Sequence, residues 1–233
     1  FENGQAKRIS TKFVDQELAP SGLTWIEGES LGPFLYQTGW AFPRNRGVVL
    51  YKDGLDSTTY IKIRRLANQL IKKGFRVTFN TDFIGALDRV RDQKRKDGSV
   101  WIQNSRYLDS DLYQTTVESY HLGRRFSVEV WNEKNQLVGG IIGNKEGSLY
   151  SPDSTFYDFE NYPGISIGFA KIAMIALMDR LKAAGIPFVD AGMVTPFTAL
   201  MKGRLIPSSE FKNLIQQLPE NAAVDFSQPW TGK

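Results

Sequence analysis

Cysteine is absent from the 233 residues of this sequence, and histidine occurs once, as His121. The lack of cysteine excludes disulfide bonds and thiolate chemistry, and it fits a cytoplasmic protein. A single histidine excludes histidine-rich zinc sites and makes a Ser-His-Asp arrangement a poor explanation of any activity. His121 itself stands just before Gly123 at an expected helix end, where we predict that it packs or caps.

Long apolar runs and nucleotide-binding glycine motifs are also missing. The longest apolar stretch, residues 165–181, is interrupted by Ser166, Lys171, Asp179 and Arg180, so it does not read as a bilayer span. No Gly-x-Gly-x-x-Gly follows a strand and no P-loop is present, which argues against dinucleotide and nucleoside triphosphate sites. The carboxylates are scattered along the chain, and this does not favour a metal centre.

The residues that are present form an ordinary globular composition with an uneven charge. Apolar residues make up 41% and charged residues 23% of the chain, and the net charge is +4. Basic residues gather between Lys62 and Lys96, where the acidic residues are Asp82, Asp88 and Asp92. On charge alone a solvated helix face followed by a charged loop is the better explanation, and a surface for nucleic acid phosphates is the alternative.

Apolar periodicity and turn residues predict alternating helices and strands. The expected helices cover residues 56–73, 82–90, 109–122, 165–184 and 195–203, with a last one beginning at 207. The expected strands cover 48–51, 75–80, a hairpin over 126–142, 148–150 and 186–192. Residues 32–46 are expected to be irregular. This alternation predicts an α/β or α+β layered domain with a mixed β-sheet.

Three local patterns refine this prediction. Apolar stripes are expected on the first two helices: Ile61, Leu66, Leu70 and Ile71, then Phe83, Ile84, Leu87 and Val90. In the hairpin, Gly139 and Gly140 permit either a bulge or a close backbone approach. Pro152-Asp153-Ser154 is a common turn sequence, so the residues alone favour a turn closed by Asp153.

Six motifs in fixed order carry a resemblance to a known family. They are FRVTFNTDFIGALDRV, SVWI, VESYHLGRRFSVEVWNEKNQLVGGIIG, SLYSPDSTFYD, FVDAGMV and RLIPSSEF. The set resembles the leucyl/phenylalanyl-tRNA–protein transferase family over about residues 34–217, and the hairpin is its strongest element. The resemblance implies an N-terminal arm over 1–31, a smaller N-terminal α/β domain over 32–98, and a GNAT-like acyltransferase domain over 99–233.

The resemblance also implies a reaction. Members of this family take leucine or phenylalanine from a charged tRNA and attach it to the N-terminal amine of a protein that begins with Arg or Lys. An amine attacking an ester carbonyl requires orientation, a group that accepts the amine proton, and donors for the oxyanion. The expected partners are therefore an aminoacyl-tRNA and an acceptor N-terminus, with no metal and no other cofactor.

Two carboxylates match catalytic positions of the family. The family's Gly-Glu-Ser, whose glutamate contacts the reacting amine, corresponds to Pro152-Asp153-Ser154. Its Asp-Cys-Gln at a strand end corresponds to Asp190-Ala191-Gly192, so the aspartate is retained and the glutamine is replaced by glycine. The resemblance thus assigns catalysis to Asp153 and Asp190. Bonding of backbone groups after its strand is the structural alternative for Asp190.

The binding residues follow from the same comparison. The resemblance assigns the substrate pocket to Trp101, Phe156, Ser154, Gly192, Phe42 and Arg44. It assigns contacts with tRNA phosphates to Lys62, Arg65, Lys94, Arg95 and Lys96. Core packing is the alternative for Trp101 and Phe156. The family's cation a few residues after the catalytic carboxylate is Asp158 here.

Two other functions stay open at this point. Gly164 and Gly168 stand at the start of the long helix, where free backbone N–H groups could bind the pyrophosphate of coenzyme A in a diverged acyltransferase. The glycine at position 192 would also suit a protein that binds tRNA ends or peptides without catalysis.

Overall fold

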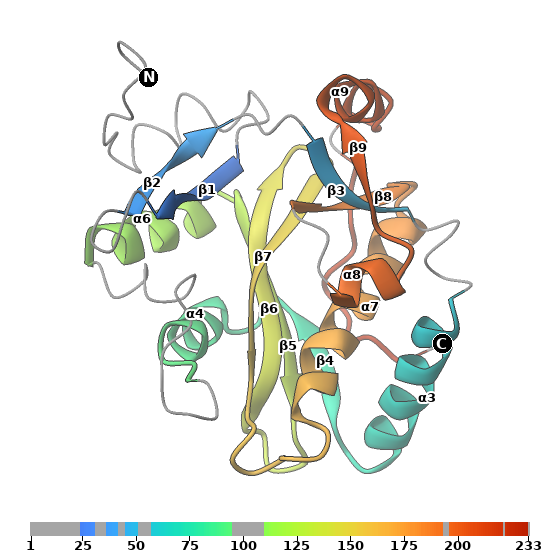
Figure 1. The fold of residues 1–233 in the computed structure, drawn as a ribbon. Coiled ribbons are helices and arrows are strands. Elements are labelled where there is room, and N and C mark those ends of the chain that lie inside the picture. Colours follow the sequence, from blue (N-terminus) through green and yellow to red (C-terminus); the bar gives the residue numbers. More distant parts are fainter. Residues whose placement is uncertain are drawn as a thin grey trace.

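The computed structural model describes residues 24–30, 36–41, 45–50, 57–94, 110–192, 196–220 and 222–232. Figure 1 shows how its helices and strands are arranged. The elements are β1 (Thr24–Ser30), β2 (Tyr36–Ala41), β3 (Asn45–Leu50), α3 (Thr58–Lys72), β4 (Arg76–Phe79), α4 (Phe83–Arg91), α6 (Ser110–His121), β5 (Arg125–Trp131), β6 (Leu137–Glu146), β7 (Leu149–Tyr157), α7 (Ser166–Ala183), β8 (Phe188–Gly192), α8 (Pro196–Leu200), β9 (Arg204–Pro207) and α9 (Ser208–Gln216).

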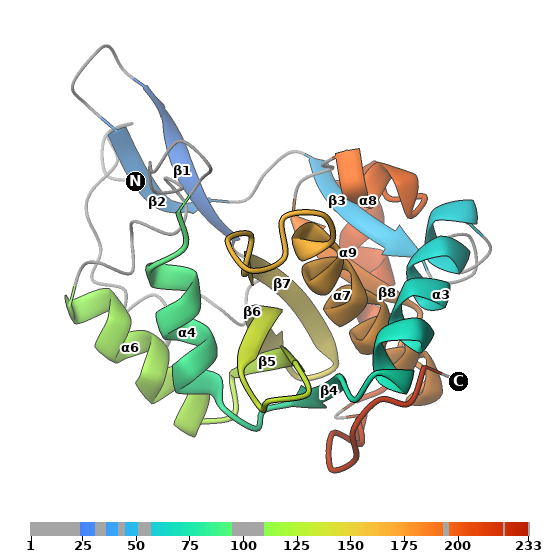
Figure 2. The ribbon, with the colours of Figure 1, turned by 90° about the horizontal axis from the view of Figure 1, so that it is seen from below.

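The centre of the molecule is a four-stranded antiparallel sheet in the order β4-β5-β6-β7. Helix α7 covers one face, with α3 packed against it, and α4 and α6 cover the other face (Figures 1 and 2). The predicted hairpin is confirmed as β5 and β6, and the predicted combination of α and β structure in layers is confirmed. The prediction of a mixed sheet was wrong, because all the strand pairs in the described residues are antiparallel. Because both faces are covered, most residues of β5 and β6 are buried, including polar ones.

The alternation along β5 sends different residues to the two faces. Phe126, Val128 and Val130 lie in the larger core cluster, on the α7 side. Glu129 lies on the other side and is fully buried. Its carboxylate accepts hydrogen bonds from the Thr78 hydroxyl at 2.7 Å, the Ser127 hydroxyl at 2.5 Å and the backbone N–H of Thr81 at 3.1 Å. These donors satisfy a charge that would otherwise oppose folding.

The helices confirm the predicted starts and correct the predicted stripes. Ser57 caps α3 and Asp82 caps α4, each accepting a backbone N–H through its side chain. The buried residues of α3 are Tyr60, Ile63, Ala67 and Leu70, and those of α4 are Phe83, Ala86, Leu87 and Val90. Ile61 is 44% exposed and Ile84 is 38% exposed, so assigning them to the buried stripes was wrong. The buried stripe of each helix includes a residue, Tyr60 in α3 and Ala86 in α4, that a search for strongly apolar side chains does not select.

A second sheet has the order β8-β3-β9, and β1 pairs with β2. Strand β2 lies inside residues 32–46, so the expectation of an irregular segment there was wrong. Strand β3 pairs with β8, and β4 pairs with β5, so segments before and after residue 98 share two sheets. The division into domains at 98/99 stays a prediction.

Helix α7 is deeply buried, and its residues from Ile172 to Met178 are all buried. It ends at Gly185, whose φ of +76° is the left-handed conformation that glycine adopts at helix ends. A Cβ on Gly168 would lie 3.0 Å from the side chain of Leu66, so this glycine lets α3 approach α7 closely. None of the described helices is long and apolar enough to cross a membrane.

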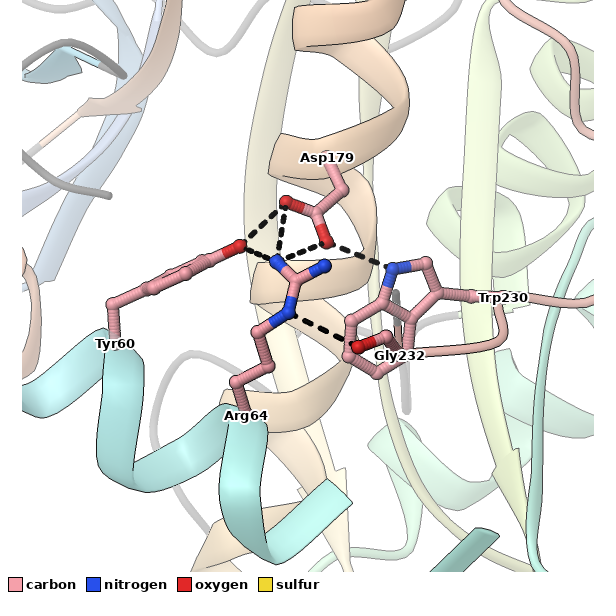
Figure 3. A network of polar contacts seen from close by, with 5 residues as sticks. All are labelled: Tyr60, Arg64, Asp179, Trp230 and Gly232. Carbon is pink, nitrogen blue, oxygen red and sulfur yellow. Dashed lines mark hydrogen bonds and ion pairs between the residues drawn. The ribbon is translucent and has the colours of Figure 1, made fainter. Parts of the chain in front are cut away.

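The C-terminal segment, residues 222–232, fastens α3 and α7 to the free edge of β4. The backbone N–H of Trp230 donates to the carbonyl of Val77 at 2.9 Å, and Phe226 stacks on Phe79 with ring centres 4.9 Å apart. Figure 3 shows the polar part of this junction, where Asp179 of α7 accepts hydrogen bonds from Tyr60, Arg64 and Trp230. The segment thereby covers an edge that would otherwise expose unpaired backbone groups.

Candidate functional site

Asp153 lies in a β-bulge in the middle of β7. The ladder pairs Ile142 of β6 with Ser154 and the next residue, Gly143, with Pro152, so Asp153 is the extra residue between two pairs. The prediction that Asp153 closes a turn was therefore wrong, because the strand runs through Pro152-Asp153-Ser154. Bulges of this kind bend a strand and change the direction of a side chain, and they occur often beside active sites.

Asp153 and Ser154 both lie on the face covered by α4 and α6. Ile142 packs in the cluster beneath α4, so its partner Ser154 lies on that face. Arg125 pairs with Asn144, two residues along β6 from Ile142, and hence shares the face. Its Nη1 donates to Oδ2 of Asp153 at 3.2 Å. Regular alternation would have placed Asp153 and Ser154 on opposite faces.

Asp190, the second predicted catalytic carboxylate, is fully buried in the middle of β8. Its Oδ2 accepts the Ser151 hydroxyl at 2.9 Å and its Oδ1 accepts the backbone N–H of Gly192 at 3.0 Å. Asp190 thus bonds a backbone group, as the structural alternative expected, but that group belongs to the last residue of the strand. Because Ser151 belongs to β7, this contact links two strands that lie side by side in different sheets.

The two carboxylates are therefore brought to one region of the fold. Ser151, which bonds Asp190 of β8, and Asp153 are two residues apart on β7. Arg125 comes from the second strand across, with β6 between. The region combines two aspartates, one guanidinium and one hydroxyl, which can orient an amine and accept its proton.

Glycines make this geometry possible at two positions. A Cβ on Gly143 would lie 2.5 Å from the backbone oxygen of Ser151 and 2.7 Å from the ring of Phe126. Only glycine therefore fits opposite the bulge. Gly192 has φ of +66°, and no atom lies within 4 Å of the place where its Cβ would be. A larger side chain at position 192 would have space but would strain the backbone.

The remaining predicted binding residues are distributed as follows. Ser154 is buried beside Asp153, and Phe156 is fully buried in the cluster beneath α4. This burial does not favour a direct contact between Phe156 and a substrate, and that contact stays a prediction. Trp101, Phe42, Arg44, Arg95 and Lys96 lie outside the described residues.

The described basic residues do not form one surface. Lys62 and Arg65 are exposed on α3, and Lys94 is exposed just after α4. The two helices lie on opposite sides of the four-stranded sheet in both views (Figures 1 and 2). Lys62 and Arg65 therefore lie in a different region from Lys94, and the predicted tRNA contacts stay predictions.

Sequence reasoning missed Arg125 and Ser151. The available signal was the alternation of polar residues in β5, where Arg125, Ser127 and Glu129 occupy every second position of an otherwise apolar strand. Such a pattern indicates a polar stripe on a covered face. Ser151 gave no comparable signal, because its partner Asp190 is distant in sequence.

Gly168 has a structural explanation that removes it from a coenzyme A site. Its backbone N–H donates to the carbonyl of Ile165 at 2.7 Å, and its missing side chain makes room for Leu66. Within the described ranges no three His, Asp or Glu side chains gather closely enough to hold a metal ion. His121 is exposed in the last turn of α6, with its ring 5.7 Å from that of Tyr120.

Comparison with known proteins connects this site to a reaction class. The family model described as leucyl/phenylalanyl-tRNA protein transferase matches residues 55–216. The chain is 28% identical over 194 residues to a leucyl/phenylalanyl-tRNA–protein transferase of Hydrogenovibrio crunogenus, covering 82% of this chain and 67% of that one. It is 27% identical over 188 residues to the transferase of the same name from Ruegeria pomeroyi, covering 81% and 78%.

The chain therefore belongs to the leucyl/phenylalanyl-tRNA–protein transferase family. The members of this family are aminoacyltransferases. The family reaction moves leucine or phenylalanine from aminoacyl-tRNA to protein N-termini. The resemblance seen in the sequence, the enzyme class and the predicted reaction are confirmed at this level. A solved structure of L-PGS from Bacillus licheniformis aligns with a TM-score of 0.42 at 12% identity, over 77% of this chain and 65% of that one, which is too loose to support an argument.

Proposed function

We propose that Asp153 orients the amine of the acceptor N-terminus and accepts its proton during the family reaction. The observation that carries this proposal is the contact of the Asp153 carboxylate with Arg125 at the bulge in β7. Asp190 is fully buried, so we assign it a role through Ser151 and the backbone of Gly192.

The chemistry balances without another reactant. The lone pair of the neutral amine attacks the ester carbonyl, and a C–N bond forms while the bond from that carbon to the ribose oxygen breaks. The amine proton passes to Asp153 and from there to the departing ribose oxygen. Since the ester is already activated, correct placement of the amine supplies much of the acceleration.

The substrates and their contacts are proposed from the family resemblance. The donor is Leu-tRNA or Phe-tRNA, the acceptor begins with Arg or Lys, and charged tRNA places the reaction in the cytoplasm. The donor pocket comprises Trp101, Phe156, Ser154, Gly192, Phe42 and Arg44. The tRNA phosphates meet two regions: Lys62 and Arg65 on α3, and Lys94, Arg95 and Lys96 after α4. Residues 99–233 form the GNAT-like acyltransferase domain, and 1–31 and 32–98 form the arm and the smaller domain.

The test is the intact mass of a peptide beginning with Arg after incubation with the protein and Phe-tRNA or Leu-tRNA. We expect the peptide to gain one residue with wild-type protein and the gain to be abolished by Asp153→Ala. Asp158→Asn is the matched control, because Asp158 caps a turn through hydrogen bonds from Asn161 and should leave transfer unchanged. An unchanged peptide mass with wild-type protein, while another enzyme of the family transfers, would contradict the proposed function.

A further inference from the structure

We infer that Arg125 is a positioning residue for the transfer reaction, whose guanidinium holds the carboxylate of Asp153 in the orientation that receives the acceptor amine. The inference rests on the proposed function of Asp153. It adds a residue that acts through Asp153 and is supplied by a different strand.

The first argument is the burial of the pair. The side chain of Arg125 is 7% exposed and that of Asp153 is 20% exposed, and Nη1 lies 3.2 Å from Oδ2. A guanidinium in such surroundings is strongly unfavourable unless a carboxylate compensates its charge. Arg125 and Asp153 therefore constrain one another more strongly than an exposed ion pair would.

The second argument is the path that joins the two residues. Arg125 pairs with Asn144 across the β5–β6 ladder, and Asn144 pairs with Ser151 across the β6–β7 ladder. Arg125 thus lies level with Ser151. Its ion pair with Asp153 crosses β6 diagonally, because Asp153 is two residues further along β7. Asp153 follows Ser151 by two residues, so alternation places its side chain on the face of Arg125, and the bulge keeps Ser154 on that face as well.

The third argument is the specificity of the pairing. The next carboxylate along the chain, Asp158, accepts two hydrogen bonds from Asn161, at 3.0 Å and 2.8 Å. Arg125 is directed to Asp153 and not to this neighbour. A carboxylate is free to rotate about its Cβ–Cγ bond, and a hydrogen bond to Oδ2 selects the plane in which the second oxygen lies. Fixed polar groups of this kind need no reorganisation when the reaction occurs.

The test is a double-mutant cycle of Arg125→Met and Asp153→Asn, with kcat and KM measured for Phe-tRNA and for a peptide beginning with Arg. We expect Arg125→Met to lower kcat by about 10-fold or more, because small displacements of a reacting group have effects of that size. Both KM values should stay within about threefold, since substrate binding is not removed. In the Asp153→Asn background, Arg125→Met should have little further effect on kcat.

Two rescue measurements separate positioning from a purely structural role. Arg125→Lys should recover part of the lost kcat, and millimolar ethylguanidinium should raise kcat of Arg125→Ala while NaCl at the same ionic strength should not. Arg64→Met is the matched control, because it breaks another partly buried ion pair, Arg64–Asp179 at 3.0 Å. It should lower stability without changing kcat.

Each outcome has a distinct meaning. A rise in KM for Phe-tRNA with kcat unchanged would assign Arg125 to donor binding and overturn the inference. Additive effects of the two substitutions on kcat, or a loss in Arg125→Met no larger than in Arg64→Met, would overturn it in favour of a structural role. Wild-type activity that survives Asp153→Asn would overturn the proposed role of Asp153, and the absence of transfer by wild-type protein would overturn the proposed function itself.

Discussion

Trp230 donates its indole N–H to Oδ2 of Asp179 at 2.9 Å, joining the C-terminal segment to the central helix α7 (Figure 3). The same carboxylate accepts the Tyr60 hydroxyl at 2.7 Å and Arg64 Nη1 at 3.0 Å. Arg64 also donates from Nε to the carbonyl of Gly232 at 3.0 Å. The Asp179 carboxylate of α7 thus joins α3 and the C-terminal segment to α7.

Trp230→Phe should reduce the free energy of unfolding by about 1.5–3 kcal/mol, because it removes a hydrogen bond to a charged, largely buried group. Phenylalanine is also smaller than tryptophan, so the loss includes a packing contribution besides that of the N–H. Urea unfolding followed by circular dichroism measures it. Trp131→Phe is a suitable comparison, since Trp131 donates to the neutral hydroxyl of Thr78 and should cost less. Equal losses would contradict the importance of the Asp179 charge.

Stability should also depend on pH through Asp179. Burial raises the pKa of Asp179 above its usual range, and the opposing attraction of Arg64 and the Trp230 hydrogen bond do not cancel that effect. The folded protein therefore holds this proton at pH values where the unfolded chain has released it. As pH rises from the ordinary aspartate value through the raised pKa, wild-type protein should lose stability relative to Asp179→Asn. The test is urea unfolding of both proteins between pH 3.5 and pH 7, in steps of about half a pH unit. A stability of wild-type protein relative to Asp179→Asn that stays constant or rises with pH would refute the prediction.

Gly143→Ala should destabilise the protein by about 1–3 kcal/mol and reduce transfer, because the new methyl would collide with the backbone of β7 at Ser151. Relief of this collision requires the bulge to shift, which moves Asp153. Gly164→Ala is the matched control, because no atom lies within 4 Å of its Cβ position. Thermal unfolding and the peptide-mass assay give the two readouts, and a variant with unchanged activity would show that the bulge is not needed.

Glu129→Gln should cost about 1–3 kcal/mol, since an amide N–H₂ would replace an oxygen that now faces only donors. Glu133→Gln, an exposed change in the turn between β5 and β6, should have almost no effect. Chemical unfolding of the two variants provides the comparison. If Glu129→Gln left the free energy of unfolding unchanged, the buried carboxyl group would have to be protonated already and donate a hydrogen bond itself.

The parts of the fold that the sequence predicted are those determined locally. Capping by Ser57 and Asp82, the hairpin of β5 and β6, and the end of α7 at Gly185 each depend on a few neighbouring residues. Strand β9 and the pairing of β3 between β8 and β9 depend on partners far away in the chain, and local propensity carries no information about them.

The site shows the same division. Asp153 and Asp190 were predicted from their motifs, but the bulge at Asp153 arises from a mismatch between two strands that no single segment displays. The turn prediction failed for this reason: proline, aspartate and serine favour a turn in isolation, and pairing with β6 overrode that preference. The contact between Arg125 and Asp153 depends on the order of the strands, which places β5 and β7 on either side of β6.

The bulge has a consequence for how this region of the chain can change. Substituting Asp153 alters the chemistry of one group, whereas deleting it would make Pro152–Gly143 and Ser154–Ile142 consecutive pairs of a regular ladder. Every other side chain of β7 would keep its partner on β6 and its face of the sheet. The bulge is therefore a place where β7 can lose one residue without a change in the register of the sheet.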